Sequence, residues 1–273
     1  MRTLRPLDSG EVATLVDWAA AEGWNPGIGD AAAFHAADPG GFLGAFVDGE
    51  MVAGISAVAY GEHCGFIGLY ICRPDRRGQG HGKAVWDAAM IRLAGRTIGL
   101  DGVPEQQANY RSMGFADAYG TVRLTGMALL GDDPAIVPCD AAMLPALAAY
   151  ERHCFPAPRE DFLVRWIEAP RVARAYVEGG EIRGYGVVRP CVSGHKIGPL
   201  FADTPEIAGA LLGRLGAIAG GPVSIDVPAA NIGAISPFFR EAEPGFATAR
   251  MYRGPAPALR LDRVFGTTTL ELG

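Results

Sequence analysis

Three glycines at alternate positions, Gly78, Gly80 and Gly82, follow an apolar stretch at residues 66–71 and precede a helical pattern that begins at about Lys83. The apolar stretch is typical of a buried strand, and the glycines indicate a turn. Because glycine has no Cβ atom, successive backbone N–H groups of such a turn can converge on one point. The first turn of the helix adds unpaired donors and the positive end of its dipole. This order of strand, glycine turn and helix predicts a pyrophosphate site.

The residues around the glycine turn exclude two common phosphate-binding motifs. A dinucleotide fingerprint has the pattern G-x-G-x-x-G with an acidic residue about 20 positions later, whereas this turn is G-x-G-x-G after two arginines. A P-loop ends in Lys followed by Ser or Thr, but Ala84 follows Lys83 here. A glycine-rich surface turn that binds no ligand stays open as the alternative.

Two segments of the chain resemble the GNAT N-acetyltransferase family. Residues 77–82, Arg-Gly-Gln-Gly-His-Gly, match the Arg/Gln-x-x-Gly-x-Gly/Ala signature of that family and follow a strand that ends in an x-x-Pro step at residues 72–74. Residues 101–115 resemble the next strand end and helix of the family, in which a tyrosine, here Tyr110, stands four residues before a Gly-Phe pair. The two motifs lie about 30 residues apart, as the resemblance requires.

The resemblance implies acetyl-CoA as the acyl donor. In the family the pyrophosphate of coenzyme A lies on the glycine turn, and the pantetheine amides pair with the edge of the preceding strand. Backbone donors of the same strand stabilise the oxyanion. Carried over by position, the residues expected to bind coenzyme A are Tyr70, Ile71, Cys72, Arg76, Arg77, Gly78, Gln79, Gly80, His81, Gly82, Lys83, Asn109 and Tyr110.

The same resemblance implies that a neutral amine attacks the thioester directly. Tyr110 is the expected general acid, because a tyrosine with a pKa near 10 keeps its proton at neutral pH and can deliver it to a thiolate. A buried core aromatic is the alternative role for this side chain. Glu62 and His63, together with Asp30, are candidate bases for the incoming ammonium, and a base near neutral pKa favours His63. Each of the three also fits an ordinary turn residue.

Composition indicates a globular protein. Of the 273 residues, 49% are apolar and 20% are charged, and the net charge of −6 disfavours nonspecific binding to nucleic acid. The five cysteines form no C-x-x-C pair, which favours buried thiols in a reducing compartment over disulfides or a metal site. No signal peptide and no apolar run of membrane-spanning length is found, so we expect a cytoplasmic protein, monomeric or homodimeric, with no membrane partner.

The first half of the chain follows the GNAT order of elements. We expect strands at residues 2–6, 42–47, 51–60, 66–71, 96–100 and 118–124, and helices at residues 10–22, 31–37, 83–94 and 105–113. The strand at residues 118–124 is expected to close the sheet of this unit. The N-cap of the first helix is expected at Asp8 or Ser9. In a GNAT fold the link between the first two helices walls the acceptor pocket, so Trp24, Asn25 and Asp30 are candidate substrate contacts. Packing of Trp24 onto the core is the alternative.

The second half repeats the first at a spacing of about 130 residues. Residues 182–184 correspond to residues 52–54, and the pair Gly114-Phe115 recurs as Gly245-Phe246. Internal repeats of this kind indicate a tandem duplication. We expect strands at residues 172–177, 182–190, 197–201 and 223–227, and helices at residues 141–155, 205–219 and 231–239.

The second copy lacks the glycine turn. Residues 201–209 have no glycine triplet and carry Asp203 and Glu206, which would repel a pyrophosphate. The second unit therefore resembles the degenerate C-terminal GNAT-like unit of some bacterial acetyltransferases, which is thought to complete the acceptor site. From this unit, the candidate acceptor contacts are His195, Asp226 and Asn231, and a satisfied core or loop role is the alternative for each.

These observations predict an α/β (α+β) fold of two tandem GNAT-like units, each a mixed, mostly antiparallel sheet flanked by helices. We expect a catalytic domain at residues 1–130 and a degenerate domain at residues 136–273. The predicted activity is acetyl-CoA-dependent transfer of an acetyl group to the primary amine of a small molecule or peptide. A non-catalytic acyl-CoA-binding or ligand-sensing module, and a partner-binding protein that uses only the fold, are the alternatives.

Overall fold

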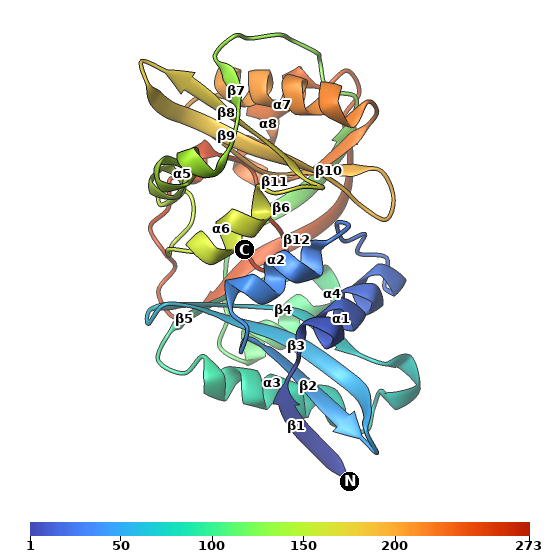
Figure 1. Cartoon of the computed structure of the whole chain (residues 1–273). Helices are drawn as coiled ribbons and strands as arrows, with labels where there is room; N and C mark the ends of the chain where they lie inside the picture. Colours follow the sequence, from blue (N-terminus) through green and yellow to red (C-terminus); the bar gives the residue numbers. More distant parts are fainter.

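The computed structural model describes all 273 residues and places two halves of the chain side by side (Figure 1). The first half contains β1 (Arg2–Pro6), α1 (Ser9–Ala21), α2 (Asp30–Ala37), β2 (Phe42–Val47), β3 (Glu50–Tyr60), β4 (Cys64–Cys72), α3 (His81–Arg92), β5 (Thr97–Gly102), α4 (Pro104–Ser112) and β6 (Ala116–Gly126). The second half contains β7 (Ile136–Pro138), α5 (Leu144–Glu151), α6 (Glu160–Trp166), β8 (Val172–Glu178), β9 (Glu181–Pro190), β10 (His195–Ala202), α7 (Pro205–Ala219), β11 (Val223–Pro228), α8 (Ile232–Ile235), β12 (Glu243–Arg253) and β13 (Val264–Gly266).

The strands form one continuous sheet of mostly antiparallel pairs, which confirms the predicted mixed class. Its order is β1-β2-β3-β4-β5-β12-β6-β11-β10-β9-β8-β7, with β13 paired to β10. Only β4 with β5 and β10 with β11 pair in parallel. Helix α3 covers one face of β2, β3 and β4, while α1 packs on the opposite face, and α7 covers β8, β9 and β10.

The two halves exchange their long final strands. Strand β12 of the second half lies between β5 and β6, and β6 of the first half pairs with β11. The prediction that residues 118–124 close the sheet of the first unit is therefore wrong, because a strand from the other half separates β6 from β5. The alternating pattern of a strand predicts its faces but not its neighbour. The predicted boundary at residues 130–136 falls between β6 and β7, although the sheet is continuous across it.

Most predicted elements are present with small shifts at their ends. Helix α1 begins with a capping box, in which the Asp8 side chain accepts from the Glu11 N–H at 2.9 Å and Glu11 accepts from the Asp8 N–H at 3.0 Å. The sequence reading missed helix α6 and strands β7, β12 and β13. The predicted helix at residues 231–239 is instead the single turn of α8 between two short 3₁₀ turns.

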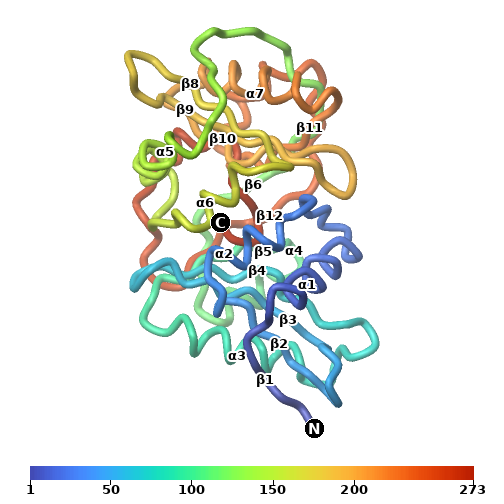
Figure 2. The backbone as a smooth tube through the Cα atoms, viewed as in Figure 1, coloured from blue at the N-terminus to red at the C-terminus, as the bar shows by residue number.

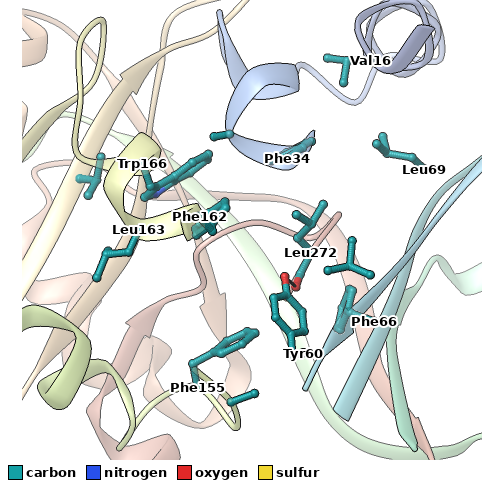
Figure 3. Packing of buried hydrophobic residues seen from close by; sticks show 14 of the residues in the cluster. Val16, Phe34, Tyr60, Phe66, Leu69, Phe155, Phe162, Leu163, Trp166 and Leu272 are labelled. Atoms are coloured by element: carbon teal, nitrogen blue, oxygen red, sulfur yellow. Dashed lines mark hydrogen bonds between the residues drawn. The ribbon is translucent and has the colours of Figure 1, made fainter. Parts of the chain in front are cut away.

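A hydrophobic core lies between the halves and includes side chains from both (Figure 3). Phe34 of α2 stacks on Trp166 of α6, with ring centroids 6.2 Å apart, and Tyr60 meets Phe155 edge-on at 4.9 Å. Leu272, near the C-terminus, is fully buried in the same cluster. Figure 2 shows the last residues returning to the middle of the molecule between the halves. Because this core is shared, neither half buries its apolar surface alone.

All five cysteines are free thiols, and no group of metal-ligating side chains is present. None of the helices has the length and apolar character that crossing a membrane requires.

Candidate active site

Strand β4 carries a bulge where the site begins. Gly68 pairs with Ser56 of β3 and Ile71 pairs with Gly54, so that two residues of β4 lie opposite one residue of β3. Leu69, within the bulge, has a φ of 46°, a left-handed conformation that is unusual for a non-glycine residue. The bulge turns the end of the strand away from the regular ladder.

Beyond the bulge, β4 and β5 separate. The parallel pairing of these strands covers only Cys64–Ile67 with Thr97–Leu100. The edge of β4 from Leu69 to Cys72 therefore has no strand partner on the β5 side. Unpaired backbone N–H and C=O groups at such an edge can accept an added extended chain.

A cavity of about 500 Å³ occupies the gap between the two strands. Its first-half walls come from the end of β4, from Leu100 and Asp101 of β5, and from Asn109 and Tyr110 of α4. Five further lining residues belong to elements that the halves share or exchange. These are Arg123 of β6, Phe246 and Thr248 of β12, and Leu270 and Glu271 of the C-terminal tail.

The glycine turn lies beside this cavity in an open conformation. Gly78 and Gly80 have φ values of 75° and 78°, and no other atom lies within 4 Å of a Cβ placed on either. Helix α3 begins at His81, two residues before the predicted start, because Gly80 in this conformation serves as its N-cap. The first helical bond runs from the Ala84 N–H to the Gly80 carbonyl, so the preceding amide groups have no partner within the helix. The turn thus fits an anionic group such as a pyrophosphate.

Charged side chains of the turn lie close to the cavity. Arg77 lines the cavity, donates to the Cys72 carbonyl at 3.1 Å and forms an ion pair with Glu22. Lys83 is exposed and pairs with Asp87 at 2.6 Å, one turn along α3. Both cations are therefore near the free amide groups, although only Arg77 reaches the cavity wall.

Tyr110 faces the cavity from helix α4. Its ring stacks on Trp86 with centroids 5.5 Å apart, and the ring of Tyr70 is also 5.5 Å from that of Trp86. Burial, and to a lesser extent the proximity of Tyr70, raises the pKa of Tyr110 to about 12. The Tyr110 hydroxyl makes no hydrogen bond within the protein. It therefore holds its proton at neutral pH and is free to donate it.

Two of the three predicted acceptor contacts in the first half hold the halves together instead. Trp24 lines the cavity as predicted. The Asn25 side chain, however, donates to the Ser193 carbonyl and accepts from the Ser193 N–H, both at 2.9 Å. Asp30 is only 1% exposed and pairs with Arg171 at 3.0 Å and Arg189 at 3.5 Å. These contacts occupy both polar groups outside the cavity.

The predicted acceptor contacts of the second half also lie outside the cavity lining. Asp226 accepts two hydrogen bonds from Arg123, at 2.8 and 2.9 Å, and so orients a side chain that does line the cavity. Asn231 donates to the carbonyls of Leu261 and Val264 and holds the segment that leads into β13. His195 is half-buried at the start of β10.

Glu62 and His63 lie in the exposed turn between β3 and β4. Strand β4 runs from this turn to the cavity at its other end, and neither side chain lines the cavity. The geometry therefore does not support their predicted role as bases.

Glu271 is a cavity residue that the sequence reading missed. The tail that carries it crosses from the second half, where the Thr267 N–H donates to the Asp226 carbonyl at 2.8 Å, to β3 of the first half. There the Ser56 hydroxyl donates to the Glu271 carbonyl at 3.4 Å. Glu271 lines the cavity and is only 8% exposed. The first half has no repeated segment that corresponds to this tail, so the internal repeat could not point to Glu271.

The second half contains a related gap that a strand fills. Strands β10 and β11 pair in parallel only over His195–Ile197 and Val223–Ile225, and β10 has a bulge between Ile197 and Leu200. Strand β13 then pairs with β10, with Leu200 opposite Gly266. The edge that is free in β4 is therefore occupied in β10.

Comparison with known proteins identifies the family. A model described as the Acetyltransferase (GNAT) family matches residues 11–120, and one described as an Acetyltransferase (GNAT) domain matches residues 147–266. Holothin acyltransferase from Pseudoalteromonas sp. (strain SANK 73390) is 30% identical over 277 residues, which cover 99% of this chain and 94% of that protein. The chain belongs to the GNAT acetyltransferase family.

Solved structures of GNAT proteins share the fold. An acetyltransferase structure from Pyrococcus horikoshii matches with a TM-score of 0.84 and 21% identity, over 100% of this chain and 96% of that one. A tandem GNAT protein from the clavulanic acid biosynthesis pathway matches with a TM-score of 0.61 and 15% identity, over 94% of this chain and 100% of that one. The protein is thus a tandem GNAT enzyme that transfers an acyl group, and its fold implies a CoA thioester and an acceptor as substrates. The predicted domain limits stay predictions.

Proposed function

We propose that this GNAT protein is an acetyl-CoA-dependent N-acetyltransferase that acts on the primary amine of a small molecule or peptide. The observation that carries the proposal is the free edge of β4, which borders a cavity between the open glycine turn and Tyr110. These three features supply a pyrophosphate cradle, an edge for an extended amide chain and a proton donor. In the second half β13 covers the related edge, so the reaction belongs to the first half.

The donor side of the proposal follows from the chemistry of the residues present. The amide groups of the turn from Gly78 to Gly82, with Arg77 beside them, suit the pyrophosphate of acetyl-CoA. The edge from Tyr70 to Cys72 suits the pantetheine amides. Backbone donors at Ile71 and Cys72 are candidates for stabilising the oxyanion. One preorganised donor of this kind lowers the activation free energy by roughly 3 kcal/mol.

The acceptor side is bounded by aromatic and apolar side chains. Trp24, Phe246 and Leu270 line the cavity, whose volume is within the range of small-molecule sites. The full-length relative is named as an acyltransferase of holothin. Both observations favour a small molecule over a folded protein as the acceptor. The cytoplasmic location and the monomeric or homodimeric state stay predictions.

The proposal is tested by incubating the purified protein with acetyl-CoA and a panel of primary amines and following the release of free thiol. We expect amine-dependent thiol release and, in calorimetry, saturable binding of acetyl-CoA. Absence of acetyl-CoA binding would contradict the proposal. Turnover of a longer acyl-CoA in preference to acetyl-CoA would correct the donor and leave the acyl transfer intact.

A further inference from the structure

We infer that Glu271 binds the ammonium group of a cationic acceptor and removes its proton before attack. This inference rests on the proposed function and names both the charge of its substrate and the missing base. It begins from the position of Glu271, a buried acidic residue that lines the same cavity as Tyr110.

The cavity has one charged side chain without a counter-charge. The carboxylate of Glu271 makes no ion pair within 4 Å and accepts no hydrogen bond from the protein. The other charged side chains of the lining are all neutralised by a partner within that distance, in the pairs Glu22–Arg77, Asp101–Arg250 and Arg123–Asp226. Burying an unpaired carboxylate is costly. A ligand that carries a positive charge would supply the missing partner.

The cations around Glu271 are committed to other acceptors. Arg123 of β6, Arg189 of β9 and Lys196 of β10 interact with Glu271 electrostatically, but none lies within 4 Å of it. Arg123 donates to Asp226. Arg189 pairs with Asp30 and donates to the Thr268 carbonyl at 3.1 Å, while Lys196 donates to the Trp24 carbonyl at 3.0 Å. None of these three cations therefore forms a direct ion pair with Glu271.

The tail holds Glu271 in a fixed position. Its own carbonyl accepts from Ser56, and the Leu272 carbonyl accepts from the Tyr60 hydroxyl at 3.0 Å. Two residues before it, the Thr269 hydroxyl accepts from the Leu272 N–H at 2.9 Å. A side chain on a backbone anchored at both sides is preorganised, which is what a group that must orient a substrate requires.

The chemistry balances with these two side chains. The ammonium loses one proton to the Glu271 carboxylate, which later releases it to solvent. The neutral nitrogen attacks the thioester carbon, the C–N bond forms and the C–S bond breaks. Tyr110 gives its proton to the leaving thiolate, and the second proton lost by the nitrogen returns to Tyr110 through solvent. The products are the amide, coenzyme A and one proton.

The test compares Glu271→Gln with the wild type, using tyramine as the acceptor because Trp24 and Phe246 line the cavity. We expect kcat/KM for tyramine to fall about 100-fold at pH 7, with unchanged binding of acetyl-CoA. The deficit should shrink as the pH approaches the ordinary pKa of the amine, because more of the tyramine is then already neutral. Glu243→Gln is the matched control, since Glu243 is exposed on β12, outside the cavity and in no ion pair.

Several outcomes would overturn the inference. One is a Glu271→Gln enzyme that is as active as the wild type at pH 7. Another is a reduction in kcat/KM for tyramine that is the same at every pH. Wild-type protein also provides a test that needs no variant: tyrosol, the uncharged alcohol analogue, should bind at least 10-fold more weakly than tyramine, and equal affinities would exclude a charge-specific site. If the wild type bound tyramine but turned over no amine with acetyl-CoA, the proposed function would fail while the ammonium site stood.

Discussion

Asp101 of β5 and Arg250 of β12 form a buried two-point ion pair, with distances of 2.9 and 2.8 Å, across the boundary between the two halves. Their side chains are 0% and 6% exposed. The pair lies where β12 of the second half enters the sheet of the first half, and Asp101 also lines the cavity. Loss of this ion pair would therefore disturb both the exchanged strand β12 and the wall of the cavity.

We predict that Arg250→Met destabilises the protein by about 3–5 kcal/mol, because it leaves a buried carboxylate without its partner. Burial raises the pKa of Asp101 and Arg250 opposes this rise, so the variant should raise it further. A carboxyl whose pKa is higher in the folded state loses stability as the pH rises through the interval between its unfolded and folded pKa values. The loss in the free energy of unfolding relative to the wild type, measured by urea unfolding, should therefore be smaller at pH 4.5 than at pH 7.

The exposed Arg253, three residues further along β12, provides the control for this measurement. Arg253→Met should change the free energy of unfolding by less than about 0.5 kcal/mol, as is usual for a surface substitution. A deficit in Arg250→Met that did not depend on pH would show that Asp101 is not the group left unpaired.

We predict that Gly68→Ala impairs both stability and acyl transfer. A Cβ at residue 68 would overlap the backbone carbonyl of Glu271, which the fold holds in place. Relief of this overlap must displace β4 or the tail, at a cost of about 1–3 kcal/mol. The control is Gly120→Ala, where the nearest atom to the added Cβ is at 3.6 Å and the contact is ordinary. Melting temperatures and thiol release of both variants provide the comparison, and equal behaviour would mean that the tail is mobile.

We predict that Tyr110→Phe lowers kcat about 100-fold while the binding of acetyl-CoA is retained. The substitution keeps the ring that stacks on Trp86 and removes only the hydroxyl. Because burial raises the pKa of Tyr110 to about 12, its ionisation should not cause a fall in the wild-type rate between pH 7 and 10. Initial rates across that range check both statements. A variant with wild-type kcat would mean that Tyr110 contributes only to packing.

The sequence predicted those parts of the site that are local in the chain. The glycine turn and Tyr110 are each recognised within a short segment, and the repeat located most strands of the second half. Asp30 shows where such reasoning fails. A carboxylate in a Gly-rich link suggested a substrate contact, but Asp30 pairs with Arg171, in the loop after α6, and with Arg189 of β9, both far away in sequence.

Glu271 was missed for the same physical reason. Its chemistry depends on which groups surround it, and these come from β3, β6, β9 and β10. The exchange of β6 and β12 was not predicted either, because β12 was not recognised as a strand and the alternating pattern of β6 does not specify which strand lies beside it. Contacts between distant segments decide both features, and a single sequence does not record them.

We predict that each chain binds one molecule of acetyl-CoA and not two. In the first half the edge of β4 is free, whereas in the second half β13 pairs with β10 and Asp203 replaces the glycine turn, with its carboxylate 3.1 Å from Arg263 and 2.9 Å from the Tyr150 hydroxyl. Calorimetric titration should give a stoichiometry near one. Gly80→Val should abolish this binding, because a β-branched residue is strained at a φ of 78° and its side chain would enter the turn. Residual binding with an unchanged stoichiometry in Gly80→Val would place the coenzyme A site elsewhere.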